Sequence, residues 1–148
     1  MTYKVALAVV LLGVLPAAAA AQEKEVIQVP GALEGMPFSS AVRVGDLLYL
    51  SGQIGTLPGT RDLPQGGVGP ETRQTLENIR GVLEHAGSSL ERVVKCTVFL
   101  ADIADYAAMN EVYRTYFPER PPARSTVAGS GLALGARVEI ECIALVGA

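Results

Sequence analysis

The segment 137–146 restricts the fold most, because it alternates as a β-strand does and yet carries apolar side chains on both faces. One face would present a continuous apolar row: Val138, Ile140, Cys142, Ala144 and Val146. The other would mix two acids with two apolar side chains: Glu139, Glu141, Ile143 and Leu145. A sheet built on this strand needs cover on both faces, and any apolar surface that no helix covers must be buried by another subunit.

Two helices are available to cover that sheet. The first is predicted over residues 70–86, with Pro70 and Glu71 in its first turn and Gly87 just past its end. The second is predicted over residues 106–117, with Asp105 as its cap. One side of the second helix carries a row of large side chains: Tyr106, Met109, Tyr113 and Tyr116. Since two helices can cover only one face of such a sheet, we expect a symmetric homo-oligomer.

The other elements are predicted to be strands. They are residues 25–29, 38–44, 47–54, 93–100 and 123–128. Gly45 and Asp46 suit the tight turn of a hairpin. The strand 93–100 is expected to bury Val94, Cys96, Val98 and Leu100. The resulting order, β-β-β-α-β-α-β-β, is that of one α+β domain, with the long Gly-rich loop 55–69 as a candidate for lining a site.

The N-terminus is typical of a secretory signal peptide. Lys4 precedes an apolar run over residues 5–15, and Pro16 and an alanine stretch lead to a cleavage site after Ala21. The run is short for a membrane span, which needs roughly 20 apolar residues. A buried helix and an uncleaved anchor are the alternatives. We therefore predict a signal peptide over residues 1–21, a mature domain over residues 22–148, and a periplasmic or secreted protein with no membrane contact after cleavage.

Composition excludes several classes of function. The formal net charge is −3, there is no Trp and no basic run, so nucleic acid is not the expected partner. His85 is the only histidine, and it is expected at the surface near a helix C-terminus. With two distant cysteines besides, no metal site is predicted. No nucleotide-binding or nucleophile-elbow motif occurs, and no cofactor is predicted, so any catalysis rests on arginine, carboxylates, hydroxyls, backbone groups and water.

The cysteines, Cys96 and Cys142, lie far apart in the sequence and form no CxxC motif. In an oxidising compartment they have the option of pairing. Free Cys residues are often buried as small apolar side chains. Buried free thiols are therefore the favoured interpretation.

Two places have the chemistry of a site. Arg124 follows a stiff Pro-Pro-Ala segment, so its guanidinium is well placed for two hydrogen bonds to a small carboxylate. A structural ion pair explains such an arginine equally well. Glu139 and Glu141 should project to one side of the last strand, where acids are usually solvated. Burial at a subunit interface would instead raise the pKa of such a carboxyl towards the range used for proton transfer.

Four motifs resemble the Rid (RidA/YjgF) family in order and spacing. They are Ser51-Gly52-Gln53-Ile54, Val94 to Leu100, Pro122-Ala123-Arg124-Ser125 and Val138-Glu139-Ile140-Glu141. The resemblance covers the chain from about Val26 onward. It implies a chorismate-mutase-like fold with two helices on one face of a single sheet, a homotrimer whose sheets form a central barrel, and clefts between subunits. It also implies hydrolysis of 2-enamine and 2-imino acids such as 2-aminoacrylate to 2-keto acids and ammonia, without a cofactor.

The resemblance assigns roles to particular residues. Arg124 matches the arginine that binds the substrate carboxylate, and Glu139 the glutamate that orients or activates water. Ser51, Gly52 and Asn110 match other positions of the cleft. Without the family, Ser51 and Asn110 would be an ordinary strand-end hydroxyl and a helix-surface amide.

Two cleft positions depart from the family pattern. Phe38 stands where active members usually have tyrosine, and Thr126 where they usually have cysteine. Deaminase activity is the expectation, since Arg124 and Glu139 remain. A non-catalytic protein that binds small carboxylates or protects against stress is the alternative, and a chorismate mutase is a weaker third.

Overall fold

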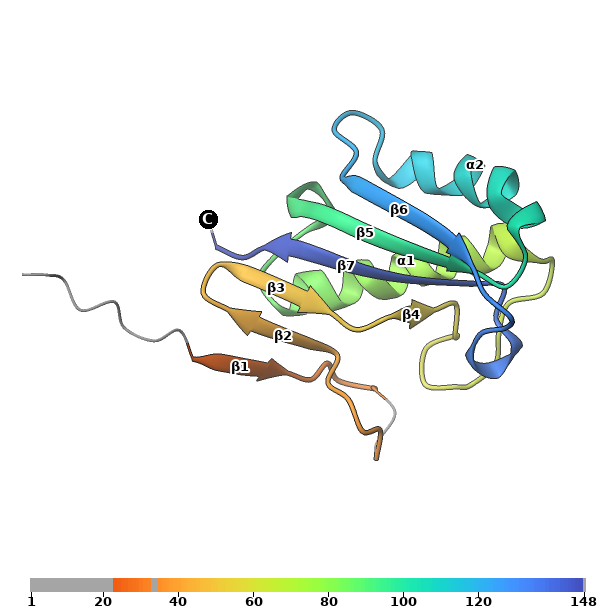
Figure 1. Cartoon of the computed structure of the whole chain (residues 1–148). Helices are drawn as coiled ribbons and strands as arrows, with labels where there is room; N and C mark the ends of the chain where they lie inside the picture. The colour runs from red at the N-terminus through yellow and green to blue at the C-terminus, as the bar shows by residue number, and fades with distance from the viewer. Residues whose placement is uncertain (1–22, 33–34, 148) are drawn as a thin grey trace, which may run out of the picture.

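A computed structural model describes residues 23–32 and 35–147 of the chain. The predicted signal peptide and its cleavage site lie outside these residues. Within them, no helix is both long and apolar enough to cross a membrane. The described part is a single sheet with two α-helices, which agrees with the predicted α+β class (Figure 1).

The sheet is mixed, and its strands run in the order β1-β2-β3-β7-β5-β6. Their bounds are β1 Lys24–Ile27, β2 Ala41–Val44, β3 Leu47–Leu50, β5 Val93–Leu100, β6 Ala123–Ala128 and β7 Val138–Leu145. A short strand, β4 (Gln53–Ile54), also pairs with β7. Only β5 and β6 are parallel, because the helix between them returns the chain to the same end of the sheet.

The predicted strand 47–54 is divided in the structure. Tyr49 pairs with Ile143, and Gln53 pairs with Ile140, so four steps on one side match three on the other. The extra residue interrupts the ladder at Ser51-Gly52, as a bulge does. The hairpin turn itself is as predicted, with Gly45 at a φ of 59° that glycine adopts without strain.

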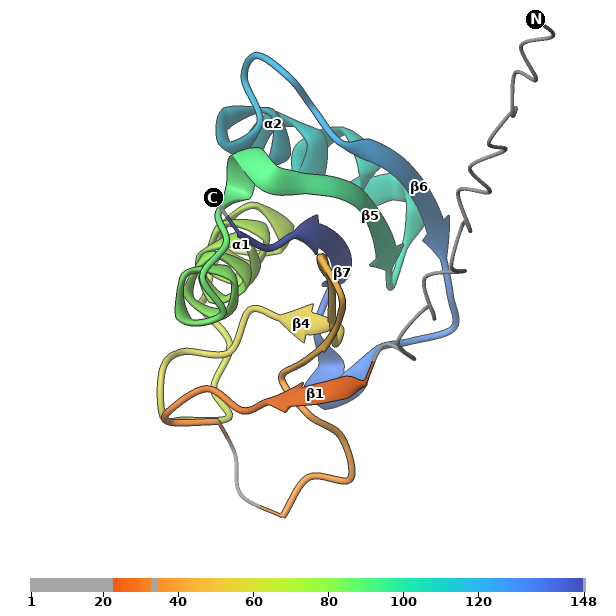
Figure 2. The same cartoon turned by 90° about the vertical axis from the view of Figure 1, so that its left-hand side faces the viewer.

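Both helices lie on one face of the sheet (Figure 2), as predicted. Helix α1 spans Val68–His85 and helix α2 spans Tyr106–Tyr116. Leu76, Ile79 and Leu83 of α1 are fully buried, and they pack in one apolar core with the inward rows of β5 and β7. His85 is exposed at the end of α1, as expected.

Two local predictions about packing are wrong. Val94 is exposed, because a bulge between Val93 and Lys95 turns it out of the core and buries Val93 in its place. Asp105 makes no capping bond to α2, because its carboxylate binds Arg137 instead. Along the predicted row of α2, Met109 and Tyr113 are buried, whereas Tyr106 is 43 % exposed.

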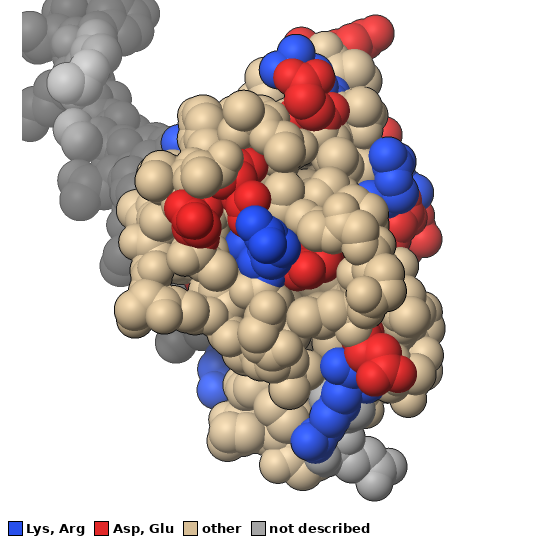
Figure 3. Space-filling view, turned by 90° about the vertical axis from the view of Figure 1, so that its right-hand side faces the viewer, with Lys and Arg blue, Asp and Glu red and all other residues tan. Residues whose placement is uncertain are grey.

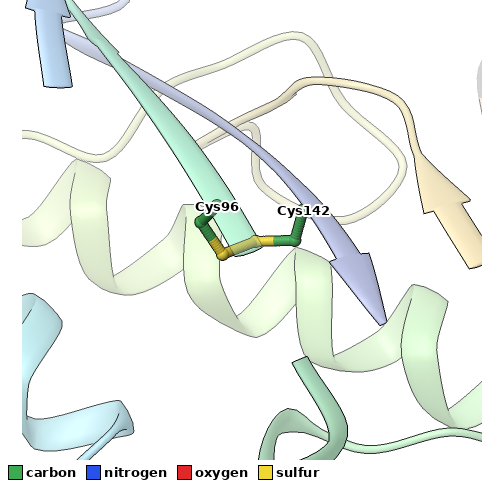
Figure 4. The surroundings of a disulfide bond; sticks show 2 residues. All are labelled: Cys96 and Cys142. Atoms are coloured by element: carbon green, nitrogen blue, oxygen red, sulfur yellow. A yellow bond between two sulfur atoms is a disulfide. The ribbon is translucent and has the colours of Figure 1, made fainter. Parts of the chain in front are cut away.

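The prediction of free cysteines is also wrong. Cys96 and Cys142 face each other directly across β5 and β7, and their sulfurs form a disulfide (Figure 4). Opposite residues of an antiparallel pair place their Cβ atoms close together, which a disulfide requires. Both cysteines are buried in the core with α1. The sequence separation of 46 residues gave no sign of this pairing, because strand register is a tertiary property.

The sheet face that points away from the helices, called the open face below, carries large apolar side chains that are exposed to solvent. Tyr49, Val127 and Leu145 are each at least 40 % exposed there, and Ile143 and Phe99 are half-buried beside them. This is the uncovered apolar surface that the strand pattern led us to expect.

Candidate functional site

The guanidinium of Arg124 lies between β6 and α2. Arg124 is directly beside Cys96 in the parallel pair β5–β6, so its side chain points to the helix face. Its Cζ lies 4.6 Å from the centre of the Tyr113 ring and 5.7 Å from that of Tyr106, within the range of cation–π attraction. Nη1 lies 3.9 Å from the sulfur of Met109. Aromatic packing and the stiff segment before β6 therefore hold this side chain in place.

Arg124 has no acidic partner within the described residues. The four ion pairs found there join Arg43, Arg80, Arg114 and Arg137 to carboxylates and leave Arg124 out. Its strongest polar contact is a hydrogen bond from Nη2 to the hydroxyl oxygen of Tyr106, at 3.4 Å. The alternative of a structural ion pair thus finds no support in this part of the chain, and the guanidinium keeps donors for an anion.

Two further predicted site residues lie beside Arg124. The pKa of the Tyr106 phenol is lowered by two groups that favour its charged form. They are the amide of Asn110, one helical turn later, and Arg124 itself. Thr126 follows Arg124 on the same face of β6, and its buried Oγ1 has no hydrogen-bond partner among the described residues. Arg124, Tyr106, Asn110 and Thr126 are called the Arg124 half-site below.

A second group gathers around Glu139. Gly52 packs against the Glu139 carboxylate so closely that a Cβ at this position would overlap it. Ser51, the preceding residue, donates a hydrogen bond of 2.6 Å from Oγ to the carbonyl of Ser39. That bond fixes the loop in which the adjacent Phe38 stands 53 % exposed. Glu139, Gly52 and Ser51 are called the Glu139 half-site below.

Partial burial raises the pKa of the Glu139 carboxyl, and the nearby charge of Glu141 raises it further. The two acids share a side of β7, as predicted, because their neighbours Val138, Ile140 and Cys142 fill the core side. A carboxyl of this kind takes up a proton more readily than an exposed one, which suits a group that accepts a proton from water.

This raised pKa predicts a pH-dependent cost to folding. The folded state binds the Glu139 proton more tightly than the unfolded state, so stability falls as the pH rises from about 4.5 through the raised folded pKa. Glu139→Gln cannot ionise, so its free energy of unfolding relative to wild type should increase over that window and then level off. Chemical denaturation between about pH 4 and about pH 8 measures the difference. Glu84→Gln, the same change at an exposed position of α1, is the control. A difference that stays constant with pH would contradict the prediction.

The structure does not bring the two half-sites together within one chain. Arg124 is beside Cys96 on β5, whereas Glu139 is opposite Phe99. Cys96 and Phe99 are three positions apart, so their side chains point to opposite faces of the sheet. Arg124 therefore projects to the helix face and Glu139 to the open face.

A polar network of Arg137, Asp105 and Glu71 connects segments that lead into both half-sites. Arg137 binds Asp105 through two hydrogen bonds of 2.8 and 2.9 Å, and its backbone N–H donates at 2.7 Å to the buried carboxylate of Glu71. Arg137 stands two residues before Glu139, and Asp105 stands directly before Tyr106. The network therefore sets the start of β7 relative to the starts of α1 and α2.

Sequence reasoning did not assign Tyr106 to the site. It was grouped with the row of large side chains on one side of α2, although its spacing of four residues from Asn110 places these two on one helix face. That spacing was the available signal. What the sequence lacked was the position of β6, which brings Arg124 against this face.

The described residues contain no cluster of three or more His, Cys, Asp or Glu side chains able to hold a metal ion. Charges of both signs are interspersed on the face drawn in Figure 3, where no continuous basic surface forms. The groups left for chemistry around Arg124 and Glu139 are thus the guanidinium, the carboxylate, the hydroxyls and the backbone.

Comparison with known proteins agrees with this fold. The family model described as endoribonuclease L-PSP matches residues 30–146. The 2-iminobutanoate/2-iminopropanoate deaminase of Homo sapiens is 44 % identical over 118 residues, which cover 80 % of this chain and 85 % of that protein. Reactive Intermediate Deaminase A, chloroplastic, of Arabidopsis thaliana is 41 % identical over 133 residues, covering 88 % and 70 %.

Solved structures share the architecture. The crystal structure of E. coli TdcF with bound serine aligns with a TM-score of 0.75 at 35 % identity, covering 83 % of this chain and 99 % of that one. The prediction of a chorismate-mutase-like fold, a single sheet with two helices on one face, is confirmed. The length of the match, its identity and the shared architecture lead to one conclusion: the chain belongs to the endoribonuclease L-PSP family, the family of the Rid (RidA/YjgF) proteins.

Proposed function

We propose that this protein is a cofactor-independent deaminase that hydrolyses 2-enamine and 2-imino acids to 2-keto acids and ammonia. The observation that carries the proposal is a guanidinium held by aromatic rings and free of acidic partners in the described chain. Relatives named as imine and reactive-intermediate deaminases support the reaction class. The substrate on this proposal is a small 2-imino carboxylate, and the product a 2-keto carboxylate.

The reaction needs only groups that the chain supplies. Arg124 binds the carboxylate of the imine, and an enamine first becomes the imine by taking a proton at its terminal carbon and losing one from its nitrogen. Glu139 accepts a proton from water as the water oxygen bonds to the imine carbon. The nitrogen takes up the proton held by Glu139 and the proton of the new hydroxyl, the C–N bond breaks, and ammonia leaves while the carbonyl forms. Orientation and charge complementarity supply the rate enhancement, since this hydrolysis also proceeds slowly in water.

We further propose that the site forms between copies of the chain, arranged as a homotrimer. The Arg124 and Glu139 half-sites project to opposite faces of one sheet, so a single chain cannot present both to one substrate. The exposed apolar side chains of the open face supply the surface that such an assembly would bury. Each cleft would combine Arg124 of one subunit with Glu139 of its neighbour.

A mixing experiment tests the shared site. Arg124→Ala and Glu139→Gln should each be inactive alone. Each mixed trimer has one cleft of three with both wild-type residues, so isolated mixed trimers should show about a third of the wild-type rate. Co-expression with two affinity tags isolates the mixed assemblies, and ammonia release measures the rate. Equally inactive mixtures would contradict the shared site, as would a protein that sediments as a monomer.

We propose that the protein acts in the periplasm or outside the cell. The leader pattern of residues 1–21 supports this location. A disulfide between Cys96 and Cys142 supports it independently, since disulfides persist in oxidising compartments. Fractionation of cells that express the full chain tests the location, and N-terminal sequencing of the product tests cleavage after Ala21.

A non-catalytic carboxylate-binding protein is the second candidate. Phe38, which stands where active members usually have tyrosine, is exposed and has no hydroxyl, which favours this alternative. Thermal stabilisation by pyruvate without turnover of any imine would support binding alone.

A further inference from the structure

The hydroxyl of Tyr106 stands at the exposed edge of the Arg124 half-site. Its oxygen accepts a hydrogen bond from Nη2 of Arg124 at 3.4 Å, and the Asn110 amide also acts on it. No hydrogen bond donated by the phenol O–H to a described residue is found. The side chain is 43 % exposed, so this donor faces outward beside the guanidinium.

We propose that Tyr106 is a substrate-binding residue, whose hydroxyl donates a hydrogen bond to the same carboxylate that Arg124 binds. The inference rests on the proposed function and extends its binding site by one residue. The Tyr106 oxygen is 3.4 Å from Nη2 of Arg124, so a carboxylate oxygen can lie within hydrogen-bond distance of both groups. The lowered pKa of the phenol makes its O–H a stronger donor to an anion.

Tyr113 offers a contrast within the same cluster. Its ring packs closer to Arg124, at 4.6 Å from Cζ, but its hydroxyl is buried without a hydrogen-bond partner among the described residues. The pKa of Tyr113 is raised to about 12, mainly by burial. The two tyrosines therefore share the aromatic contact and differ in whether the hydroxyl can reach a ligand.

Replacing each tyrosine by phenylalanine separates these roles. Tyr106→Phe keeps the ring and removes one hydrogen bond to a charged acceptor, so KM for a 2-imino acid should rise about 10-fold to 100-fold. The kcat should change little, because the carboxylate is bound equally in the ground and transition states. The Kd for pyruvate, measured by calorimetry, should rise by the same factor. Tyr113→Phe should leave both constants within about twofold of wild type.

A further variant pair distinguishes direct binding from an effect through Arg124. In an Arg124→Lys background, Tyr106→Phe should still weaken pyruvate binding, because the hydroxyl contacts the ligand itself. Disappearance of the effect there would make Tyr106 only a positioning residue and overturn the proposal.

The outcomes separate this inference from the proposed function. If Arg124→Ala is inactive while Tyr106→Phe matches wild type in KM and Kd, the inference fails and the deaminase proposal stands. If no imine is hydrolysed but pyruvate binding depends on Tyr106, the deaminase proposal fails and the binding role stands.

Discussion

Arg124→Ala should lower kcat/KM for 2-imino acids by about 10²-fold to 10⁴-fold. The guanidinium can donate two hydrogen bonds to a carboxylate, and each charge-assisted bond contributes about 1.5 to 3 kcal/mol. No other Lys or Arg makes a described contact with Tyr106, Met109 or Tyr113 to take its place. The assay is release of ammonia and keto acid from an imine generated in situ.

Arg124→Lys is the matched control for this substitution. It keeps the positive charge and loses the planar fork, so kcat/KM should fall less than for alanine. Arg114→Ala, which removes an exposed arginine of α2 paired with Glu111, should leave turnover unchanged. If Arg124→Ala, Arg124→Lys and wild type all match the uncatalysed rate equally, the protein is not a deaminase.

Loss of the Cys96–Cys142 bond should destabilise the folded chain by about 4 kcal/mol. The bond closes a loop over a sequence separation of 46 residues, and cross-linking restricts the unfolded ensemble by roughly that free energy. The effect is large beside a typical domain stability of about 5 to 15 kcal/mol. Urea denaturation of the oxidised protein, compared with protein reduced while unfolded, measures it.

The burial of both cysteines provides a control for this prediction. Both cysteines are at most 2 % exposed, so reductant added to the folded protein should leave the bond intact until the chain unfolds. Cys96→Ala/Cys142→Ala removes the bond without any reductant and should unfold at a similarly lowered urea concentration. Two reactive thiols in protein purified and denatured without reductant would contradict the assignment.

Several elements could be predicted because their causes are local. The strands β5 and β6 have the predicted bounds, and both helices begin and end within two residues of prediction. β-branched runs, proline near a helix start and glycine after its end determine such elements at short range. The division of β3 from β4 was not predictable, because it arises where two strands pair with β7 in different registers.

The errors have long-range causes. Asp105 has the type and place of a helix cap, but Arg137, 32 residues later, binds its carboxylate. Val94 fits the apolar alternation, but the pairing of β5 with β7 inserts a bulge at that position. In both cases a tertiary contact, which forms only in the folded chain, overrode the local preference.

The amino-acid sequence by itself determined most of the elements and the need for cover on both sheet faces, since these follow from side-chain chemistry and short-range periodicity. The roles of Arg124 and Glu139 came from the family resemblance and stay predictions. The tertiary structure alone decided which residues meet. Strand register paired Cys96 with Cys142, placed Tyr106 against Arg124 and set Arg124 and Glu139 on opposite faces of the sheet. Register depends on packing between segments far apart in the chain, and a shift by one residue would reverse each of these placements.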